Sequence, residues 1–266
     1  MKNKRLIVIS GVTGAIGSAL FAEYGQYKDN IVYGISRKAT PLDLFVKNGK
    51  LPLKTLICGI GSLDNYSKLF KSINYSVAKE VIYIHALGLY PFEVDCNGKI
   101  KIENDLDNDG INDDVKKLTL ASFSKATESL QENWKGTLKC VIFGGIADKH
   151  HPGVHQSWWK VIEMTKDYMR NAIKLNSKLS MIIVNISSVL CPHEVITRPF
   201  VFTDTDAQKE YWLHPYKLAK FVFSSVNKSL SGFFEIEKYN IKPDFSINNY
   251  YIDNNFTPRK VRELYR

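Results

Sequence analysis

The sequence predicts an α/β fold in which a parallel sheet of about seven strands is covered by helices on both faces. Short apolar runs of strand length alternate with longer amphipathic stretches along most of the chain. The apolar runs are continuous, which is typical of strands buried on both sides. These patterns together predict a doubly wound Rossmann fold within one domain, residues 1–266.

Seven apolar runs have the length and composition of strands: Leu6–Ser10, Asn30–Ile35, Leu53–Cys58, Glu80–Ala86, Leu138–Phe143, Ser180–Ser187 and Phe233–Glu237. Amphipathic periodicity predicts the helices, which are a first one ending near Tyr27 and then Asp64–Ile73, Leu118–Asn133, His155–Asn176 and Pro215–Ser229. Two segments, near 91–114 and 191–213, fit neither pattern. Because both follow strands, we expect them on the substrate side, where ligands bind in this architecture. Asn97-Gly98 in the first segment indicates a hairpin turn.

Composition narrows the class of protein. The formal charge of +9 is compatible with an anionic ligand, but the basic residues are scattered, and no nucleic-acid partner is predicted. The four cysteines are far apart, which argues against a zinc site or a disulfide framework. No apolar run is long enough to span a membrane or to serve as a signal sequence, so we expect a cytoplasmic protein with no membrane partner.

A glycine-rich turn joins the first predicted strand to the first predicted helix. The segment Gly11-Val12-Thr13-Gly14-Ala15-Ile16-Gly17 has the position and spacing of a dinucleotide-binding loop. Gly11 permits the tight turn, Gly14 lets the backbone approach a pyrophosphate, and Gly17 allows close helix packing. We therefore expect contacts to the cofactor from Gly11, Thr13, Gly14, Ala15, Ile16 and Gly17. The alternative is a glycine-rich turn that binds no ligand.

The residues after the second strand favour NADP(H) over NAD(H). NAD-binding proteins usually place Asp or Glu there to bind the ribose 2′-hydroxyl, whereas this chain has Ser36-Arg37-Lys38. A guanidinium binds a 2′-phosphate through two hydrogen bonds, which a carboxylate would repel. The alternative is a solvated basic turn.

These features resemble the short-chain dehydrogenase/reductase superfamily. The similarity includes SGVTGAIG after the first strand, SRK after the second, and the strand spacing. The G-x-x-G-x-x-G spacing resembles the extended branch, which contains nucleotide-sugar epimerases and dehydratases. The turn after the fourth strand, His85-Ala86-Leu87-Gly88, partly matches the family's Asn-Asn-Ala-Gly. The resemblance implies cofactor contacts at His85, Ala86 and Gly88.

The family's catalytic signature is incomplete in this chain. The family has a serine at the end of the fifth strand, followed by Tyr-x-x-x-Lys on the next helix, where the lysine holds the nicotinamide ribose. Here Gly145 stands at the serine position and Gln156 at the tyrosine position, while Lys160 matches the lysine. The resemblance therefore assigns both cofactor binding and catalysis to Lys160, with Gln156 at the catalytic position. Glutamine cannot exchange a proton near neutral pH as a phenol does.

Other side chains are candidates for the missing acid. His150, His151 and His155 crowd the loop before this helix, and imidazole suits proton transfer near pH 7. His155 adjoins Gln156 and is the catalytic candidate, whereas the alternative is an exposed histidine cluster. Three Tyr-x-x-x-Lys strings occur elsewhere, but none follows the fifth strand, and only the one at Tyr216 stays as a remote candidate.

An acidic stretch, Asp105-x-Asp107-x-Asp109-Gly110, resembles a calcium loop. An EF-hand would have Glu at the twelfth position, where this chain has Lys116. We therefore expect no metal and interpret the stretch as a solvated loop, in which Asp113 or Asp114 caps a helix starting near Val115.

Three functions remain open from the sequence. The first is an NADP(H)-dependent oxidoreductase that reduces a carbonyl on a small molecule, with a sugar or nucleotide-sugar substrate suggested by the extended-branch resemblance. The second is an epimerase or dehydratase with the same cofactor. The third is a catalytically inactive NADP(H)-binding protein that acts as a sensor through a partner. Homo-oligomer formation stays open.

Overall fold

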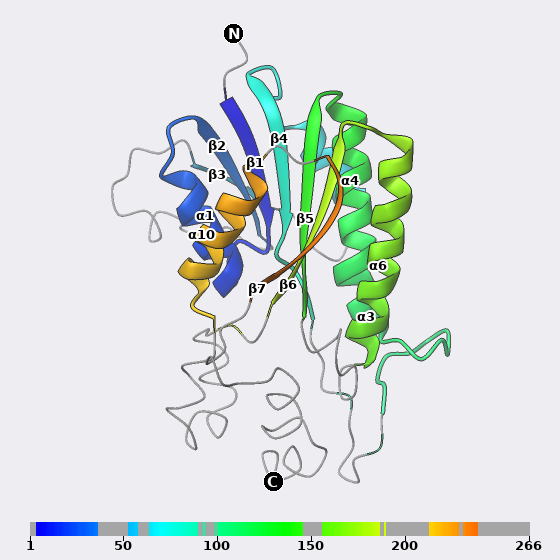
Figure 1. Ribbon diagram of the computed structural model, residues 1–266. Coiled ribbons are helices and arrows are strands. Elements are labelled where there is room, and N and C mark those ends of the chain that lie inside the picture. Colours follow the sequence, from blue (N-terminus) through cyan, green and yellow to red (C-terminus); the bar gives the residue numbers. More distant parts are fainter. Residues whose placement is uncertain are drawn as a thin grey trace.

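A computed structural model describes residues 4–36, 53–57, 64–89, 93, 99, 101–145, 156–186, 189, 213–228 and 231–238. Seven strands form one sheet in the order β3-β2-β1-β4-β5-β6-β7, and every neighbouring pair is parallel (Figure 1). The strands are β1 Lys4–Ser10, β2 Asn30–Ser36, β3 Leu53–Ile57, β4 Ala78–His85, β5 Thr137–Gly145, β6 Leu179–Ile186 and β7 Gly232–Lys238. The predicted doubly wound α/β fold is confirmed.

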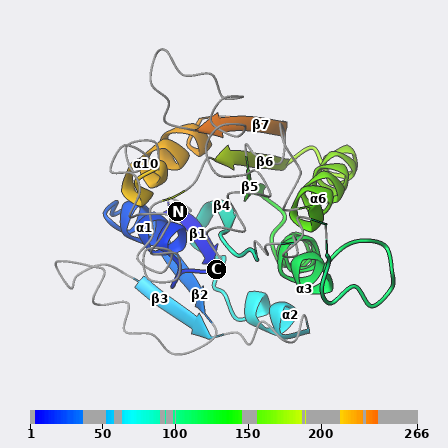
Figure 2. The same cartoon turned by 90° about the horizontal axis from the view of Figure 1, so that it is seen from below.

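Helices cover both faces of the sheet (Figure 2). On one face, α1 Ala15–Gly25 lies beside α10 Pro215–Val226. On the other face lie α2 Asp64–Lys71, α4 Ser122–Asn133 and α6 Gln156–Leu175, with the short helix α3 Asp113–Lys116 at the start of α4. The helices in the described ranges are too short or too polar to cross a membrane.

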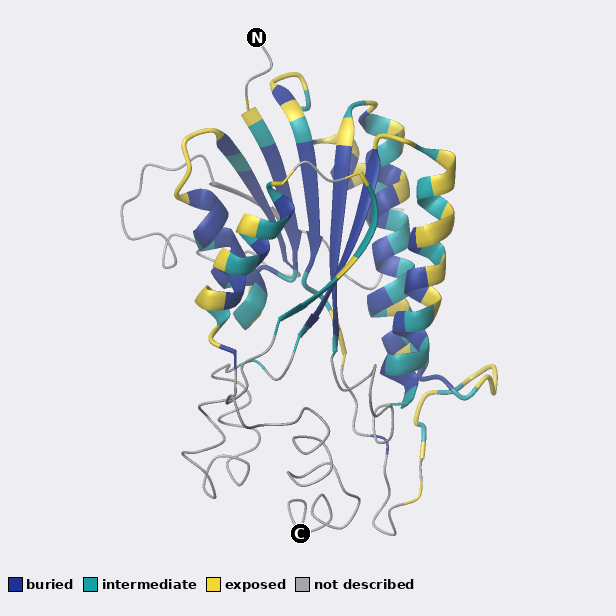
Figure 3. Cartoon of the chain, viewed as in Figure 1, coloured by how far each residue is buried: buried dark blue, intermediate teal, exposed yellow. Residues whose placement is uncertain are grey.

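The two helical layers enclose two separate cores because strand residues alternate between the faces of the sheet. Leu6 and Val8 of β1 belong to the core on the α2/α4/α6 side, whereas Ile7 and Ile9 belong to the core on the α1/α10 side. Figure 3 shows β1, β2, β4, β5 and β6 buried over most of their length, whereas the edge strand β7 is partly exposed. Continuous apolar runs in the sequence therefore marked the inner strands correctly, because these strands are covered by helices on both faces.

The helix before β5 begins earlier than predicted. It starts at Asp113, continues as a π-helical segment over Lys117–Ala121, and becomes α4 at Ser122. Asn112 is the N-cap, because its side-chain oxygen accepts hydrogen bonds from the Asp114 and Val115 amides at 2.9 and 3.2 Å. The prediction that Asp113 or Asp114 caps this helix was therefore wrong, since both residues lie inside its first turn.

The sheet reverses its strand order between β1 and β4, so the connections leave these two strands in opposite directions. In doubly wound folds, ligands bind at the carboxyl end of this switch point. The glycine-rich loop follows β1, and the His85–Gly88 turn follows β4, so both lie at this edge. The predicted hairpin turn at Asn97-Gly98 lies outside the described residues, although the Lys101 amide donates to the Glu93 carbonyl at 3.1 Å.

Candidate functional site

The glycine loop is folded tightly against its surroundings. Gly11 has a φ of +74°, and a Cβ at this position would lie 2.4 Å from the Ala86 carbonyl oxygen. A Cβ on Gly17 would lie 2.1 Å from the Gly11 carbonyl oxygen, which belongs to the backbone. Both positions therefore require glycine, the first for its conformation and its contact and the second for space alone. The loop, the turn after β4 and the start of α1 form one compact unit.

The middle of the loop is open by contrast. Gly14 is the N-cap of α1, and its amide donates to the Gly11 carbonyl at 2.9 Å. Thr13 and Gly14 are exposed, and no side chain caps the α1 N-terminus within the described part of the chain. Ala15 and Ile16 follow as half-buried residues of the first helical turn. An exposed helix N-terminus with accessible amides is suited to an anionic group such as a pyrophosphate.

The end of β2 lies next to this loop. The Val12 amide donates to the Ile35 carbonyl at 3.4 Å, which ties the glycine loop to the last residues of β2. Ser36 is the final β2 residue and is buried. Arg37 and Lys38, on which the preference for NADP(H) depends, lie outside the described residues. The position of Ser36 is where a dinucleotide-binding fold reads the adenosine ribose.

The turn after β4 meets the first turn of α6. The Ala86 amide donates to the Ser10 carbonyl at 3.1 Å, so this turn also lies against the end of β1. A Cβ on Gly88 would lie 2.9 Å from the buried ring of Trp158 in α6. Gly88 therefore has a packing role, because it makes room for the indole. The structure thus brings the predicted residues of the glycine loop, the β4 turn and α6 to one edge.

The His85 ring points into the core and not toward this edge. It is fully buried, with Nδ1 at 2.7 Å from the Tyr83 hydroxyl and Nε2 at 3.0 Å from the Leu118 carbonyl oxygen. A carbonyl only accepts, so Nε2 carries the proton and Nδ1 accepts from Tyr83. Desolvation by burial lowers the pKa of His85 to about 4, which keeps the ring neutral at physiological pH. Any dinucleotide contact at this position would therefore come from backbone atoms.

A directed hydrogen-bond chain results. Ser10 Oγ lies 2.9 Å from the Tyr83 hydroxyl and donates to it, since that hydroxyl gives its own proton to His85. This series of hydrogen bonds runs from Ser10, the residue before the glycine loop, through Tyr83 and His85 to the Leu118 carbonyl. Its members come from three elements that are distant in sequence. Tyr83 and His85 share one side of β4, which is the only sequence signal that could have linked them.

The end of this chain is in the π-helical segment. The Ser122 amide donates to the Lys117 carbonyl, one residue earlier than in a regular α-helix. The Leu118 carbonyl accepts instead from His85 Nε2 and, at 2.5 Å, from Ser122 Oγ. His85 therefore stabilises the irregular turn. Lys117, the first residue of the π-helical segment, is exposed.

The first turn of α6 contains the two described candidates for catalysis. Gln156 is its first residue and is half-buried, and Lys160 follows on the same side of the helix. Lys160 Nζ donates to the Gly110 carbonyl at 3.0 Å. No local pattern predicts this contact, because Gly110 lies fifty residues away in the chain. His150, His151 and His155 lie outside the described residues.

Glu93 is a further residue at this helix that sequence analysis missed. It is buried, and its Oε2 accepts from the Ser157 amide at 2.8 Å. A carboxylate at the N-terminus of a helix is stabilised by the helix dipole and by this charge-assisted hydrogen bond. Glu93 therefore anchors the segment after β4 to the start of α6. No local pattern around Glu93 marks it as a capping residue.

The three Tyr-x-x-x-Lys strings begin at Tyr24, Tyr75 and Tyr216, and all lie outside α6. Tyr24 is fully buried between α1 and α10, where its ring packs edge-on against Phe223. The Tyr75 hydroxyl donates to the Phe70 carbonyl at 2.9 Å. Tyr216 and Lys220 lie on the exposed surface of α10. The burial of Tyr24 and the hydrogen bond of Tyr75 are consistent with structural roles for these two residues.

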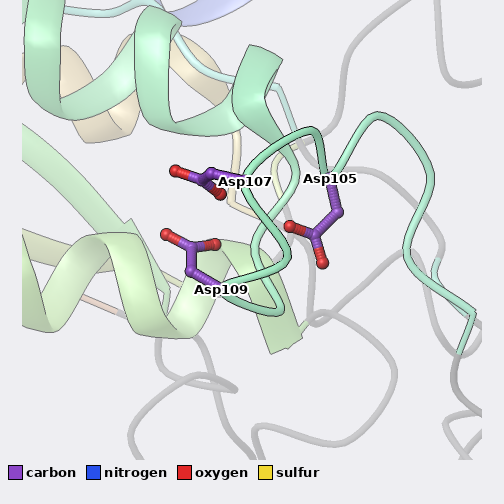
Figure 4. Close-up of side chains that lie close together, drawn as sticks. All are labelled: Asp105, Asp107 and Asp109. Atoms are coloured by element: carbon purple, nitrogen blue, oxygen red, sulfur yellow. The ribbon is translucent and has the colours of Figure 1, made fainter.

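The acidic loop, defined as residues 101–116, brings three carboxylates together (Figure 4). One oxygen from each of Asp105, Asp107 and Asp109 lies within 4.8 Å of the others. Lys116 Nζ lies 3.0 Å from Asp107 Oδ2 and 2.7 Å from Asp109 Oδ2. These two hydrogen bonds raise the pKa of Lys116, and the Lys116 hydrogen bond lowers the pKa of Asp107. An internal ammonium therefore balances part of the negative charge.

No protein-family model matches the chain, and a search of curated proteins also finds no match. Solved structures do match over nearly its whole length. A short-chain type dehydrogenase/reductase from Mycobacterium ulcerans is 10% identical, with a TM-score of 0.70 over 97% of this chain and 99% of that one. An alcohol dehydrogenase from the archaeon Thermococcus sibiricus, complexed with 5-hydroxy-NADP, is 10% identical, with a TM-score of 0.69 over 91% and 100%.

The chain has the fold of the short-chain dehydrogenases and reductases. A variant of an actinorhodin polyketide ketoreductase with NADPH has the same fold, at 11% identity and a TM-score of 0.69 over 89% of this chain and 96% of that one. The resemblance inferred from the glycine loop is therefore confirmed at the level of the fold. The match of Lys160, Gly145 and Gln156 to the family's lysine, serine and tyrosine positions stays a prediction from the sequence.

Proposed function

We propose that this protein binds a nicotinamide dinucleotide at the carboxyl edge of β1 and β4. One observation carries the proposal: the exposed N-terminus of α1 lies in a loop whose Gly11 and Gly17 cannot bear a side chain. Gly14 at the centre of this loop is exposed, so its surface is open to a ligand. The α1 amides would hold the pyrophosphate, and the residues after β2 would hold the adenosine ribose. Titration of the purified chain with NADPH tests the proposal.

The preferred cofactor is NADP(H), because Arg37 and Lys38 follow the buried end of β2. An Arg37→Ala variant is expected to bind NADPH about 10- to 100-fold more weakly, since a charge-assisted contact to the 2′-phosphate is lost. NADH affinity should stay the same, because NADH lacks that phosphate. Fluorescence titration with both cofactors measures the two effects. Equal losses for NADPH and NADH would contradict the assignment of Arg37.

The reaction that we propose is reduction of a carbonyl group, in line with the resemblance to short-chain dehydrogenases and reductases. NADPH supplies a hydride when bound. Lys160 would hold the nicotinamide ribose, and His155 or water would give a proton to the carbonyl oxygen. A sugar or nucleotide-sugar is the substrate class that the extended-branch glycine spacing suggests. The segments 91–114 and 191–213 follow β4 and β6 and would line the substrate side.

A dinucleotide-binding protein without catalytic activity is the second candidate, and Gln156 favours it. An amide in the place of the family's tyrosine cannot supply a proton. The two candidates separate in an assay that follows NADPH oxidation at 340 nm across a panel of aldehydes, ketones and oxidised sugars. Turnover that falls in a His155→Ala variant supports the oxidoreductase. NADPH binding with no turnover of any compound supports the second candidate.

A further inference from the structure

The acidic loop is seated on the first turn of α6 by hydrogen bonds from both sides. Lys160 Nζ donates to the Gly110 carbonyl at 3.0 Å, and the Asn112 amide donates to Ser157 Oγ at 2.8 Å. Ser157 is completely buried, so its hydroxyl sits in a defined place. The loop therefore contacts Lys160, the residue of α6 that the proposed function assigns to the cofactor.

Several contacts make this loop a rigid support. Ile111 and Val115 are buried in the core that also contains Trp158 and Val161 of α6. Asn112 caps α3 with its side chain while its own amide points to Ser157. Apolar anchors of this kind resist displacement, because moving them would expose buried surface to water.

The polar half of the loop is held by Lys116. Its ammonium joins Asp107 and Asp109, while Asp105 Oδ2 accepts from the Gly110 amide at 3.0 Å. Asn104, Asn108 and Gly110 have φ values of 53°, 58° and 75°, which asparagine and glycine tolerate better than other residues. Both backbone groups of Gly110 are therefore held by hydrogen bonds, the amide by Asp105 and the carbonyl by Lys160 of α6.

Gly110 fits its contact closely. A Cβ at this position would lie 2.9 Å from Lys160 Nζ, in addition to the strain of a positive φ. A lysine ammonium has three N–H donors in total. Among the described residues, one of these donors goes to the Gly110 carbonyl, so two stay available for another acceptor.

We propose that the acidic loop positions Lys160 for the cofactor. The Gly110 carbonyl fixes the direction of the ammonium, and the remaining N–H groups are then presented to the hydroxyls of the nicotinamide ribose. Gly110 and, through Asp107 and Asp109, Lys116 are positioning residues. This inference rests on the proposed dinucleotide site. The opposite role would be an inhibitory one, in which the loop keeps Lys160 from binding the cofactor.

A Lys116→Met variant tests the proposal in the full-length protein, with EDTA present to exclude metal binding by the unpaired carboxylates. The first measurement is the NADPH dissociation constant. The second is the rate at which the Lys160 amine of the ligand-free protein is acetylated, followed by mass spectrometry. We expect NADPH binding to weaken by about three- to tenfold, because a loosened loop no longer orients Lys160. We also expect Lys160 to be acetylated faster.

Two variants control for other effects. Lys101→Met removes a lysine of the same loop whose ion pair with Glu103 is 3.8 Å long and exposed, and it should leave both measurements unchanged. Lys116→Arg keeps the positive charge and should restore most of the affinity. A double Asp107→Asn, Asp109→Asn variant removes the same two ion pairs by neutralising the partners of Lys116. It should reproduce the Lys116→Met result, and it keeps the proposal testable if Lys116→Met impairs folding.

The direction of the change decides between the alternatives. Tighter NADPH binding by Lys116→Met would overturn the positioning role, because it would show that the loop competes with the cofactor for Lys160. Unchanged binding and unchanged acetylation would also overturn it, by showing that the loop does not act on Lys160. Faster acetylation in a protein whose wild type binds no dinucleotide would refute the proposed function and this role, while leaving the contact itself established.

Discussion

A Gly17→Ala variant is expected to lose both stability and dinucleotide affinity. Its methyl group would lie 2.1 Å from the Gly11 carbonyl oxygen and 2.9 Å from the Val12 Cα, which are backbone atoms that cannot rotate away. The α1 helix must then move off the loop. We expect a loss of about 3 kcal/mol in the free energy of unfolding, measured by urea titration. NADPH affinity should fall by about tenfold or more, because α1 no longer presents its first amides at the right place.

Gly14→Ala is the matched control for this prediction. Its methyl group would meet only the Gly11 carbonyl oxygen at 3.3 Å, and the position is exposed. We expect a change in stability below about 1 kcal/mol. Its dinucleotide affinity should still fall, because the methyl group stands where the pyrophosphate would approach. A Gly17→Ala protein as stable as wild type would show that the loop has more room than its contacts indicate.

The second large effect is a dependence of stability on pH that comes from His85. Burial lowers the pKa of His85 from 6.5 to about 4. Between these values the unfolded chain binds a proton that the folded chain does not, so acidification favours unfolding. The stabilisation is complete above about pH 6.5 and is lost as the pH falls toward 4. The difference corresponds to about 3 kcal/mol.

A His85→Leu variant isolates this effect from the titration of carboxylates. At pH 8 it should be less stable than wild type by about 3 kcal/mol, since Tyr83 and the Leu118 carbonyl lose their buried partner. As the pH falls from 6.5 to 4, the gap should narrow, because only wild type has a histidine to protonate at this position. His214→Leu replaces an exposed histidine and should follow the wild-type profile. A constant gap across this range would mean that the His85 ring is already charged in the folded protein.

The sequence by itself determined the seven strands and the order in which helices follow them. A strand buried on both faces reads as a continuous apolar run, and that signal is local. The predicted limits of each described strand lie within two residues of the observed ones, for example Glu80–Ala86 against Ala78–His85. The glycine loop was equally accessible, because its tightest contact joins Gly11 and Gly17, which are only six positions apart.

Tertiary structure decided the surroundings of the site, because those contacts join residues that are far apart in the chain. Asn112, Asp113 and Asp114 are all residue types that cap helices. Asn112 became the cap because its amide is held by Ser157, outside the helix, which leaves its side chain free to bind the next amides. The inward turn of the His85 ring likewise depends on Tyr83 and on the carbonyl at Leu118.

Lys160 shows most clearly the difference between what the sequence determines and what only the tertiary structure determines. Its position four residues after Gln156 is visible in the sequence, and so is its resemblance to the family's lysine. Its partner is not, because Gly110 meets it only after the acidic loop has folded against α6. Local patterns identified the strands, the helices and the phosphate loop through periodicity and glycine spacing. Only the packing of distant segments determined which polar atoms face one another, because each such contact requires two segments far apart in the sequence to lie side by side.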